Sequence, residues 1–380
     1  MSQGVLSHQV MLADKVRMDS YKKAILEVVK KDDIVCDVGT GSGILAFFSI
    51  LAGAKKVYAI ERGEIIKEAE QLACKNGFAD KIIFIKGSSD KVELPEKVDV
   101  ITSELIGFFG LEENLHRFLI DARERFLKPE GRLIPSWLEL YLAPVESEET
   151  WNKTVGFWNK DFYGLDFSCP GKEAASRGFL VDYSNKINGL ALPVMISHLN
   201  FFEIENPPLV FHAKFAANKK SYFHGLAGYF KAGLSKNIIL SNSPSEPRTH
   251  WRQAFFPIEE ALAVAKSDEI VCVIKALPQS NNLFWQWDTG LYRDGVEIAK
   301  FSQSNFHIDK EELIIGRKDF KPILTQEAEI YRRVLNLCDG NRTIEEISEI
   351  VFAEYPGKYK DIKDARREVV GTVRGKARIM

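Results

Sequence analysis

The sequence predicts an α/β protein in which an open parallel sheet comes first, an antiparallel β region follows, and a small helical module stands last. Three observations lead to this prediction. Short β-rich runs alternate with helical segments over the first third, patterns with period two follow, and residues 320–380 are charged with apolar side chains at helical spacing. At about 150 residues per domain, 380 residues suggest two or three domains.

The composition is that of an ordinary globular protein, with 45% hydrophobic and 27% charged residues. A net charge of −2 gives no electrostatic reason to expect nucleic acid or an anionic membrane as a partner. The first twenty residues lack the apolar segment of a signal peptide, and no apolar run approaches the roughly 20 residues of a membrane span. Five scattered cysteines without CxxC spacing indicate reduced thiols and predict no metal site. We therefore expect a cytoplasmic protein.

A βαβ unit is predicted in "KDDIVCDVGTGSGILAFFSILAGAKKVYAIE", residues 31–61. Residues 34–38 suit a buried parallel strand, and the apolar helix after the turn ends near Gly53. "KVYAIE" then forms a second strand that closes with Glu61, and the crossover should be right-handed. The turn between strand and helix carries the residues that we assign to a cofactor: Asp37, Gly39, Gly41 and Gly43.

The glycine spacing distinguishes between cofactors. A dinucleotide fold has GxGxxG, whereas here the third glycine comes one residue early and Ile44 follows it. A carboxylate at the end of the second strand, as at Glu61, can accept both hydroxyls of a ribose. Together these features favour an adenosyl ligand without a pyrophosphate, and S-adenosylmethionine (SAM) fits that description. A plain tight turn is the alternative.

Two further strands are predicted at residues 81–87 and 97–104. The first precedes Ser89 and Asp90, which we place at the adenine edge. The second delivers Glu104 at its carboxyl end, and ligands of open parallel sheets bind outside the carboxyl ends of strands. Glu104 should therefore face the reactive end of the cofactor.

The loop "SELIGFFGLEEN", residues 103–114, holds Glu104 and Glu113 among apolar residues and glycines. Charged side chains are costly to bury unless they are paired. A guanidinium held by both carboxylates would gain charge-assisted hydrogen bonds worth about 1.5–3 kcal/mol each, and one terminal nitrogen would stay freer to attack a SAM methyl group. The alternative is a strand end followed by the acidic first turn of a helix, "EENLHRFLIDARERFL". We assign Glu112 to that helix cap.

These motifs resemble the protein arginine methyltransferase family over roughly residues 5–305. Glu104 and Glu113 resemble its double-glutamate loop, and "CDVGTGSG" with Glu61 resembles its SAM-binding motif. "THW" at residues 249–251 resembles the loop that walls the substrate pocket, which implies that Trp251 contacts substrate.

The helix that covers the cofactor in this family resembles "HQVMLADKVRMDSY". The resemblance implies that His8 and Met11 line the methionine side of the pocket, that Arg17 binds the SAM carboxylate, and that Asp14 pairs with His250. From its residue type alone, His250 would more often be structural. Only seven residues precede His8, so we expect the aromatic helix that usually comes before this segment to be missing.

The resemblance implies a SAM-binding Rossmann-like domain over residues 1–135 and a β-barrel substrate domain over residues 136–308. Within the latter, an arm at about residues 147–182 would dock onto a second subunit and form a homodimer. "LPVMISHLNFF" and "EIVCVIKAL" independently indicate antiparallel strands, and the poor alternation of the second predicts burial on both faces. Leu105 and Leu115 stand where many members have Trp and Met, so the product type stays open.

Residues 320–380 predict a helical module of winged-helix or helix-turn-helix type. One helix should end at "CDGN", and Thr343 with Glu346 three residues later predicts a capping box. "LCDGNRTIEEISEIV" resembles the PqqD-like domain, a family that binds the leader of a ribosomally made peptide. A helical appendage is the alternative, and a DNA-binding module is disfavoured because "IEEISEIVFAE" is acidic.

The leading hypothesis is a SAM-dependent N-methyltransferase that acts on arginine in a peptide or protein, with a precursor peptide recruited by the tail. One rival keeps SAM and changes the acceptor to ornithine, another amine or a small molecule. A second rival is a catalytically silent protein that binds a peptide through its tail. The presence of both glutamates and of the "THW" triplet argues against the silent protein.

Overall fold

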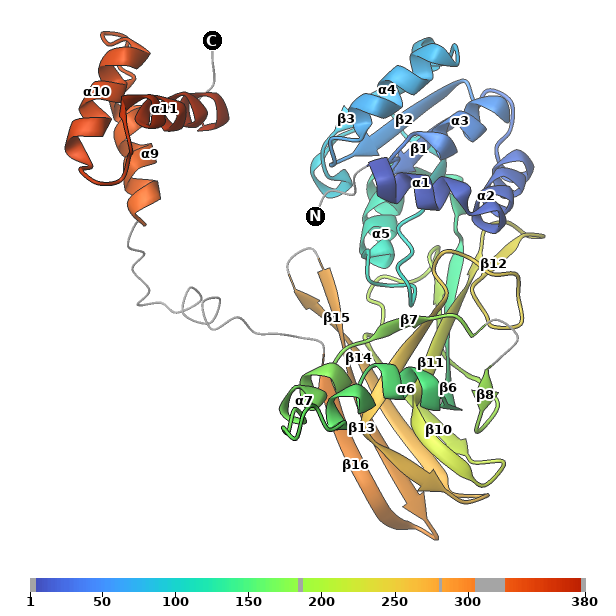
Figure 1. Ribbon diagram of the computed structural model, residues 1–380. Coiled ribbons are helices and arrows are strands. Elements are labelled where there is room, and N and C mark those ends of the chain that lie inside the picture. Colours follow the sequence, from blue (N-terminus) through green and yellow to red (C-terminus); the bar gives the residue numbers. More distant parts are fainter. Residues whose placement is uncertain (1–4, 184–186, 280–281, 305–324, 377–380) are drawn as a thin grey trace. The chain divides into compact units, whose positions relative to one another are not determined.

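The computed structural model describes residues 5–183, 187–279, 282–304 and 325–376 (Figure 1). The chain divides into two compact units, Met1–His307 and Ile308–Met380. Among the helices in the described ranges, none is both long enough and apolar enough to cross a membrane.

The first unit begins with a five-stranded parallel sheet in the order β3-β2-β1-β4-β5. Its strands are β1 (Ile34–Val38), β2 (Lys56–Glu61), β3 (Ile82–Lys86), β4 (Val98–Ser103) and β5 (Leu127–Ile134). The predicted open parallel sheet is confirmed, and the first two strands have the predicted bounds. Short buried runs bounded by glycines and charged residues give clear strand limits.

Helices accompany this sheet: α1 (Val5–Ala13), α2 (Lys15–Val28), α3 (Ile44–Leu51), α4 (Ile66–Lys75) and α5 (Leu115–Phe126), with single 3₁₀ turns at Ala79–Lys81 and Ser89–Lys91. The segment predicted as one covering helix is broken at Asp14, whose carboxylate accepts the Arg17 N–H at 3.0 Å and so caps α2. α5 begins only after Asn114, whose φ of 60° is left-handed. The assignment of Glu112 to the cap of this helix is therefore wrong.

Two antiparallel sheets form the β region. The first has the path β7-β13-β11-β6-β8, with β12 added on β11 and β9 on β6. Its strands are β6 (Trp137–Glu146), β7 (Phe179–Val181), β8 (Asn188–Gly189), β9 (Val194–Asn200), β11 (Ser221–Gly233), β12 (Ile239–Ser241) and β13 (Gln253–Val264). The second has the order β10-β14-β15-β16, formed by β10 (Val210–Ala216), β14 (Glu269–Gln279), β15 (Asn282–Arg293) and β16 (Val296–Ser304).

Strand β14 corrects one expectation. Its buried residues alternate along the chain with residues that are only partly buried, and the buried set is Ile270, Cys272, Ile274 and Ala276. One face of the strand is thus fully buried and the other is not. The apolar side chains Val271 and Val273 hid this alternation in the sequence, because they cover the partly exposed face.

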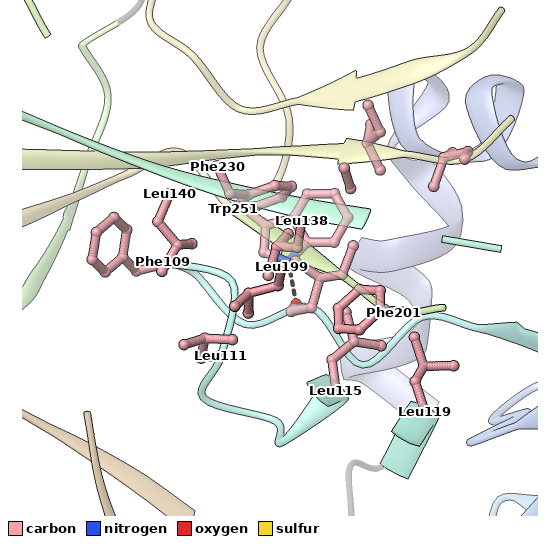
Figure 2. Packing of buried hydrophobic residues seen from close by; sticks show 14 of the residues in the cluster. Phe109, Leu111, Leu115, Leu119, Leu138, Leu140, Leu199, Phe201, Phe230 and Trp251 are labelled. Atoms are coloured by element: carbon pink, nitrogen blue, oxygen red, sulfur yellow. Dashed lines mark hydrogen bonds between the residues drawn. The ribbon is translucent and has the colours of Figure 1, made fainter. Parts of the chain in front are cut away.

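The core runs without interruption from the parallel sheet into the β region. Figure 2 shows Phe109 and Leu111, from the loop that follows β4, packed among Leu138, Leu140 and Trp251 of the β region. The loop with the two predicted catalytic glutamates therefore packs between the parallel-sheet part and the β region of this unit.

The segment predicted as an arm contains α6 (Glu148–Lys153), a 3₁₀ turn (Gly156–Asn159) and α7 (Cys169–Ala175). Aromatic rings contact one another along it, with the Phe157 and Phe162 centroids 5.1 Å apart and those of Phe162 and Phe167 5.5 Å apart. Tyr163 beside them is fully exposed, at 100%.

The second unit consists, over residues 325–376, of three helices: α9 (Gln326–Leu337), α10 (Ile344–Glu354) and α11 (Ile362–Lys376). These helices share a small apolar core that includes Ile330, Val334, Ile347, Val351 and Val369. The predicted capping box is confirmed, because Thr343 Oγ1 accepts the Glu346 N–H at 3.2 Å and the Glu346 carboxylate accepts the Thr343 N–H at 2.7 Å. Residues 320–324 of the predicted module lie outside the described residues.

Candidate active site

A cavity of about 680 Å³ opens at the carboxyl ends of the parallel strands. The loops that follow β1, β2, β3 and β4 line it together with α1 and the start of α2. Most of the predicted site residues lie in this one cavity: His8, Met11, Arg17, Gly39, Gly41, Glu61, Ser89, Glu104 and Glu113. The carboxyl ends of strands in an open parallel sheet are where ligands of such folds bind.

The glycine turn lets two other segments close over the cavity. Gly39 and Gly41 have φ values of +74° and +54°, which glycine adopts readily and other residues rarely do. A Cβ atom on Gly41 would lie 2.7 Å from the imidazole Cε1 of His8, and one on Gly39 would lie 2.8 Å from a methyl of Leu105. α1 and the glutamate loop can therefore approach the turn only because glycine stands there. Gly43 does not line the cavity but begins α3.

Asp37 does not line the cavity but forms hydrogen bonds that stabilise the glycine turn. Its fully buried carboxylate accepts hydrogen bonds from the hydroxyls of Thr40, at 2.5 Å, and Thr102, at 2.9 Å. Burial raises the pKa of Asp37 to about 6, and the two hydroxyls oppose that rise. The structure thus places this predicted cofactor ligand one layer behind the cofactor site.

Glu61 lies at the end of β2, as the ribose assignment requires. Its carboxylate accepts the backbone N–H groups of Gly41, at 3.1 Å, and Gly63. Each carboxylate oxygen has further lone pairs that can accept hydroxyl groups. The backbone hydrogen bonds hold this acceptor in one orientation toward the cavity.

Ser89 and Asp90 behave differently from each other. Ser89 lines the cavity, whereas Asp90 is not among the lining residues. The Asp90 carboxylate instead accepts the Ser88 hydroxyl at 2.5 Å and pairs with Arg117 at 2.8 Å. Its hydrogen bond from Ser88 lowers the pKa of Asp90. Ser88 and Ser89 therefore line the cavity where the adenine edge is expected, and the contact of Asp90 with adenine stays a prediction.

Arg17 and Glu104 form a buried ion pair in the cavity. Arg17 Nε donates to Glu104 Oε2 at 2.9 Å, and Arg17 Nη1 donates to the carbonyl of Met11 at 3.3 Å. The two side chains are 7% and 6% exposed. Beside them, burial lowers the pKa of His8, so its imidazole tends to be neutral. The pairing with Glu104 was not predicted, since the resemblance implied only a SAM carboxylate as the partner of Arg17.

The glutamate loop carries a third carboxylate that faces the cavity. Glu112 Oε1 accepts the indole N–H of Trp285, on β15, at 2.6 Å, and Oε2 accepts the Phe109 N–H at 3.1 Å. Glu112 lines the cavity with Glu104 and Glu113. Burial raises the pKa of Glu112 to about 7. The sequence signal was the adjacent pair of glutamates, but the wrong helix start assigned one of them to a cap.

Asp14 and His250 meet directly, as the resemblance implied. The Asp14 carboxylate accepts both the His250 backbone N–H and its Nδ1, each at 2.8 Å, while it also caps α2. The hydrogen bond from His250 helps to lower the pKa of Asp14 against the opposing effect of burial. Neither residue is among those that line the cavity, so the pair ties the β region to the covering helices.

Trp251 is placed behind the glutamate loop. Its side chain is 5% exposed, does not line the cavity, and donates its indole N–H to the Ile106 carbonyl at 2.7 Å (Figure 2). Trp251 thus contacts the glutamate loop, and its contact with substrate stays a prediction.

Comparison with known proteins gives the same picture. Residues 138–287 match a family model described as the arginine methyltransferase oligomerization subdomain, and residues 22–138 match a model described as ribosomal protein L11 methyltransferase. Over 283 residues the chain is 35% identical to protein arginine N-methyltransferase 1 of Schizosaccharomyces pombe, an alignment that covers 72% of this chain and 83% of that protein. The chain belongs to the protein arginine methyltransferase family. Protein arginine N-methyltransferase 1.1 of Arabidopsis thaliana is 33% identical, with 72% of each chain covered.

Solved structures of this family share the fold. The PRMT1 enzyme–prozyme heterotetrameric complex of Trypanosoma brucei with AdoHcy has a TM-score of 0.71 at 24% identity, covering 78% of this chain and 96% of that chain. Arabidopsis thaliana protein arginine methyltransferase 10, in a crystal structure described as uniquely open, has a TM-score of 0.66 at 27% identity, covering 79% and 97%. The predicted family and fold class are confirmed for the part of the chain that these proteins cover.

Proposed function

We propose that this arginine methyltransferase family member transfers a methyl group from SAM to a guanidinium nitrogen of arginine in a peptide or protein. The observation that carries the proposal is a single cavity that is lined by Glu61, the glycine turn and the acidic loop. A nucleoside and a cationic acceptor can therefore meet in one space.

The residues present suit SAM. Glu61 is oriented by two N–H groups to accept the ribose hydroxyls, and His8 and Met11 line the side of α1. Arg17 is a buried cation that can receive the SAM carboxylate. Bound SAM supplies an electrophilic sulfonium methyl group, so the protein has to position the nucleophile and not to activate the methyl.

Glu104 and Glu113 would hold the acceptor. Two carboxylates facing one guanidinium draw its positive charge toward them and leave the third nitrogen freer to attack. With SAM bound, the methyl–sulfur bond would break as the methyl–nitrogen bond forms, and the sulfur would leave as a neutral thioether. The proton lost by that nitrogen would pass to a loop carboxylate and from there to water. Ile106, Phe109 and Leu111 are buried around the loop, which excludes water and strengthens these charged contacts.

The test is methyl incorporation from labelled SAM into a pool of arginine-rich peptides, beside the same pool with arginine replaced by ornithine. We expect incorporation into arginine that falls at least about a hundredfold in Glu113→Gln, as loss of electrostatic stabilisation at a reacting centre does. The exposed Glu130→Gln is the matched control and should keep full activity. Incorporation only into ornithine would support the rival acceptor, and SAM binding without incorporation would support the silent protein.

We further propose that the second unit recruits the substrate, as a PqqD-like module that binds a leader peptide. In support, α9, α10 and α11 form a small core of their own. The test compares methylation of an arginine-containing precursor peptide, taken from the genomic neighbourhood of the chain, with and without its leader. A lower KM with the leader supports recruitment. Equal KM values would favour a helical appendage.

We also propose a homodimer in which the arm of one copy packs on the methyltransferase domain of another. The arm exposes apolar side chains: Phe157, Tyr163, Leu165 and Phe167. An apolar groove between α1 and α4, lined by Val5, Leu12, Ile65 and Leu72, could receive them. Tyr163→Ser with Leu165→Ser should shift the mass in sedimentation from dimer to monomer, whereas Leu192→Ser, also exposed, should not. A monomeric wild type would contradict the proposal.

A further inference from the structure

The glutamate loop, residues 103–114, accepts hydrogen bonds from three side-chain N–H donors of the β region. Trp251 donates to the Ile106 carbonyl at 2.7 Å, and Asn242 Nδ2 donates to the Phe108 carbonyl at 3.3 Å. Trp285 donates to Glu112 at 2.6 Å. The first two contacts reach backbone oxygens, and the third reaches a carboxylate that also faces the cavity.

The loop is shaped around this carboxylate. A Cβ atom at Gly107 would overlap Glu112, lying 2.7 Å from its Cβ and closer still to its Oε2. The Phe109 N–H lies 3.2 Å from Oε1 and 3.1 Å from Oε2, so the loop folds back on its own side chain. Behind it, the Phe109 and Trp285 rings are in contact, with centroids 4.9 Å apart. Glu112 is thus held by hydrogen bonds from its own loop and from β15.

We propose that Glu112 is a positioning residue of the acceptor site. Its hydrogen bond from Trp285 of β15 holds the loop that carries Glu113, and its ionised carboxylate adds a third negative charge to this loop when a cationic acceptor binds. This inference rests on the proposed arginine methylation. It predicts that acceptor affinity depends on the protonation state of Glu112.

The charges around Glu112 come from several elements. Glu104 and Glu113 lie on its own loop, Arg17 faces the same cavity from α2, and His8 faces it from α1. Glu61 and Arg62 line the cavity from the end of β2. From β15 the group that faces it is the uncharged indole of Trp285. Arg17 is already paired with Glu104, and an entering guanidinium adds a further cation beside the loop, which favours ionised Glu112.

The expected pH dependence follows from the protonation state of this group. Because burial raises the pKa of Glu112 to about 7, the carboxyl is about half protonated at neutral pH. If the ionised form binds the acceptor, the apparent KM is the intrinsic value divided by the ionised fraction. That fraction rises from roughly one tenth at pH 6 to nine tenths at pH 8, so the acceptor KM should fall about tenfold over this range.

The experiment measures acceptor KM and kcat from pH 6 to 8.5 in the full chain, with SAM saturating. In Glu112→Gln the amide oxygen still accepts the Trp285 and Phe109 N–H groups but carries no charge. We expect a raised acceptor KM that no longer changes with pH, an unchanged Kd for SAM, and kcat within about threefold. An acceptor KM and pH profile like those of the wild type would overturn the proposal.

A second variant tests the hydrogen bond and keeps the test decisive if Glu112→Gln folds poorly. Trp285→Phe keeps an aromatic ring against Phe109 but removes the donor that stabilises the carboxylate. The midpoint of the KM profile should move upward by about one pH unit, and an unmoved midpoint would overturn the role of Trp285. A wild type that methylates no arginine would defeat the proposed function as well, whereas an active wild type with an unaltered Glu112→Gln defeats only this inference.

Discussion

Replacing Arg17 by Met tests whether the buried pair with Glu104 holds the covering helices to the glutamate loop. Arg17 lies on α2 and Glu104 directly after β4, and their side chains are 7% and 6% exposed. Met fills a similar volume without a charge, so the substitution isolates the ion pair. Removing one partner of a buried pair typically costs about 3–5 kcal/mol, because the other charge stays buried without compensation. The one remaining contact from the loop to Glu104 is weak, the Ile106 N–H at 3.3 Å.

We therefore expect Arg17→Met to lower the free energy of unfolding by about 3–5 kcal/mol at pH 8. Urea unfolding followed by tryptophan fluorescence, without SAM, measures this loss.

The double variant Arg17→Met with Glu104→Gln is the control, since it removes the uncompensated charge as well. It should recover most of the lost stability, because a buried pair replaced by neutral groups often costs little. If the single variant lost less than about 1 kcal/mol, or if the second substitution restored nothing, the pair would not be the link between α2 and the loop that its burial indicates.

Three further outcomes follow from the structure. Because burial raises the pKa of Asp37 to about 6, the folded protein keeps a proton there and loses stability as pH rises from about 4 to 6. The free energy of unfolding of Asp37→Asn, measured with urea, should rise relative to that of the wild type over this range by at most about 3 kcal/mol, and the difference should stay constant at higher pH. Trp251→Phe leaves the buried Ile106 carbonyl without its indole donor, so we expect about 1–3 kcal/mol of destabilisation and slower methyl transfer, with unchanged SAM affinity by calorimetry. Thr343→Ala removes the capping box and should cost about 1 kcal/mol, seen as faster hydrogen exchange in α10 and not in the parallel sheet.

The elements that could be predicted from sequence are those whose signals are local. The strands 34–38 and 56–61 have the predicted bounds because buried β-rich runs and a glycine turn lie within one short segment. The capping box at Thr343 depends on two residues three positions apart. For such features the chain next to the residue determines its conformation.

The side-chain contacts that the sequence did not predict involve partners far away in the chain. Glu112 and Glu113 together suit the acidic first turn of a helix. The structure shows instead that Glu112 accepts a hydrogen bond from the indole of Trp285, 173 positions later. Trp251 was expected to face substrate, but its partner is the backbone carbonyl of Ile106. Asp90 forms an ion pair with Arg117 of α5, a helix whose packing cannot be read from the sequence. A side chain's direction at such positions is set by tertiary packing, which local patterns do not encode.

These long-range contacts separate two groups of residues: those that line the ligand cavity, and those that hold the glutamate loop in position. The side chains that line the cavity come from the first domain, at α1, α2 and the strand ends. The donors that fix the glutamate loop, on Trp251, Asn242 and Trp285, come from the β region. Cofactor affinity depends on the first group, because Glu61 is held by N–H groups of its own domain. Acceptor binding depends on both groups, since a shift of about 1 Å in the loop that carries Glu104 and Glu113 is enough to weaken transfer strongly. Substitutions at Trp251, Asn242 and Trp285 should therefore weaken acceptor methylation while they leave the affinity for SAM intact.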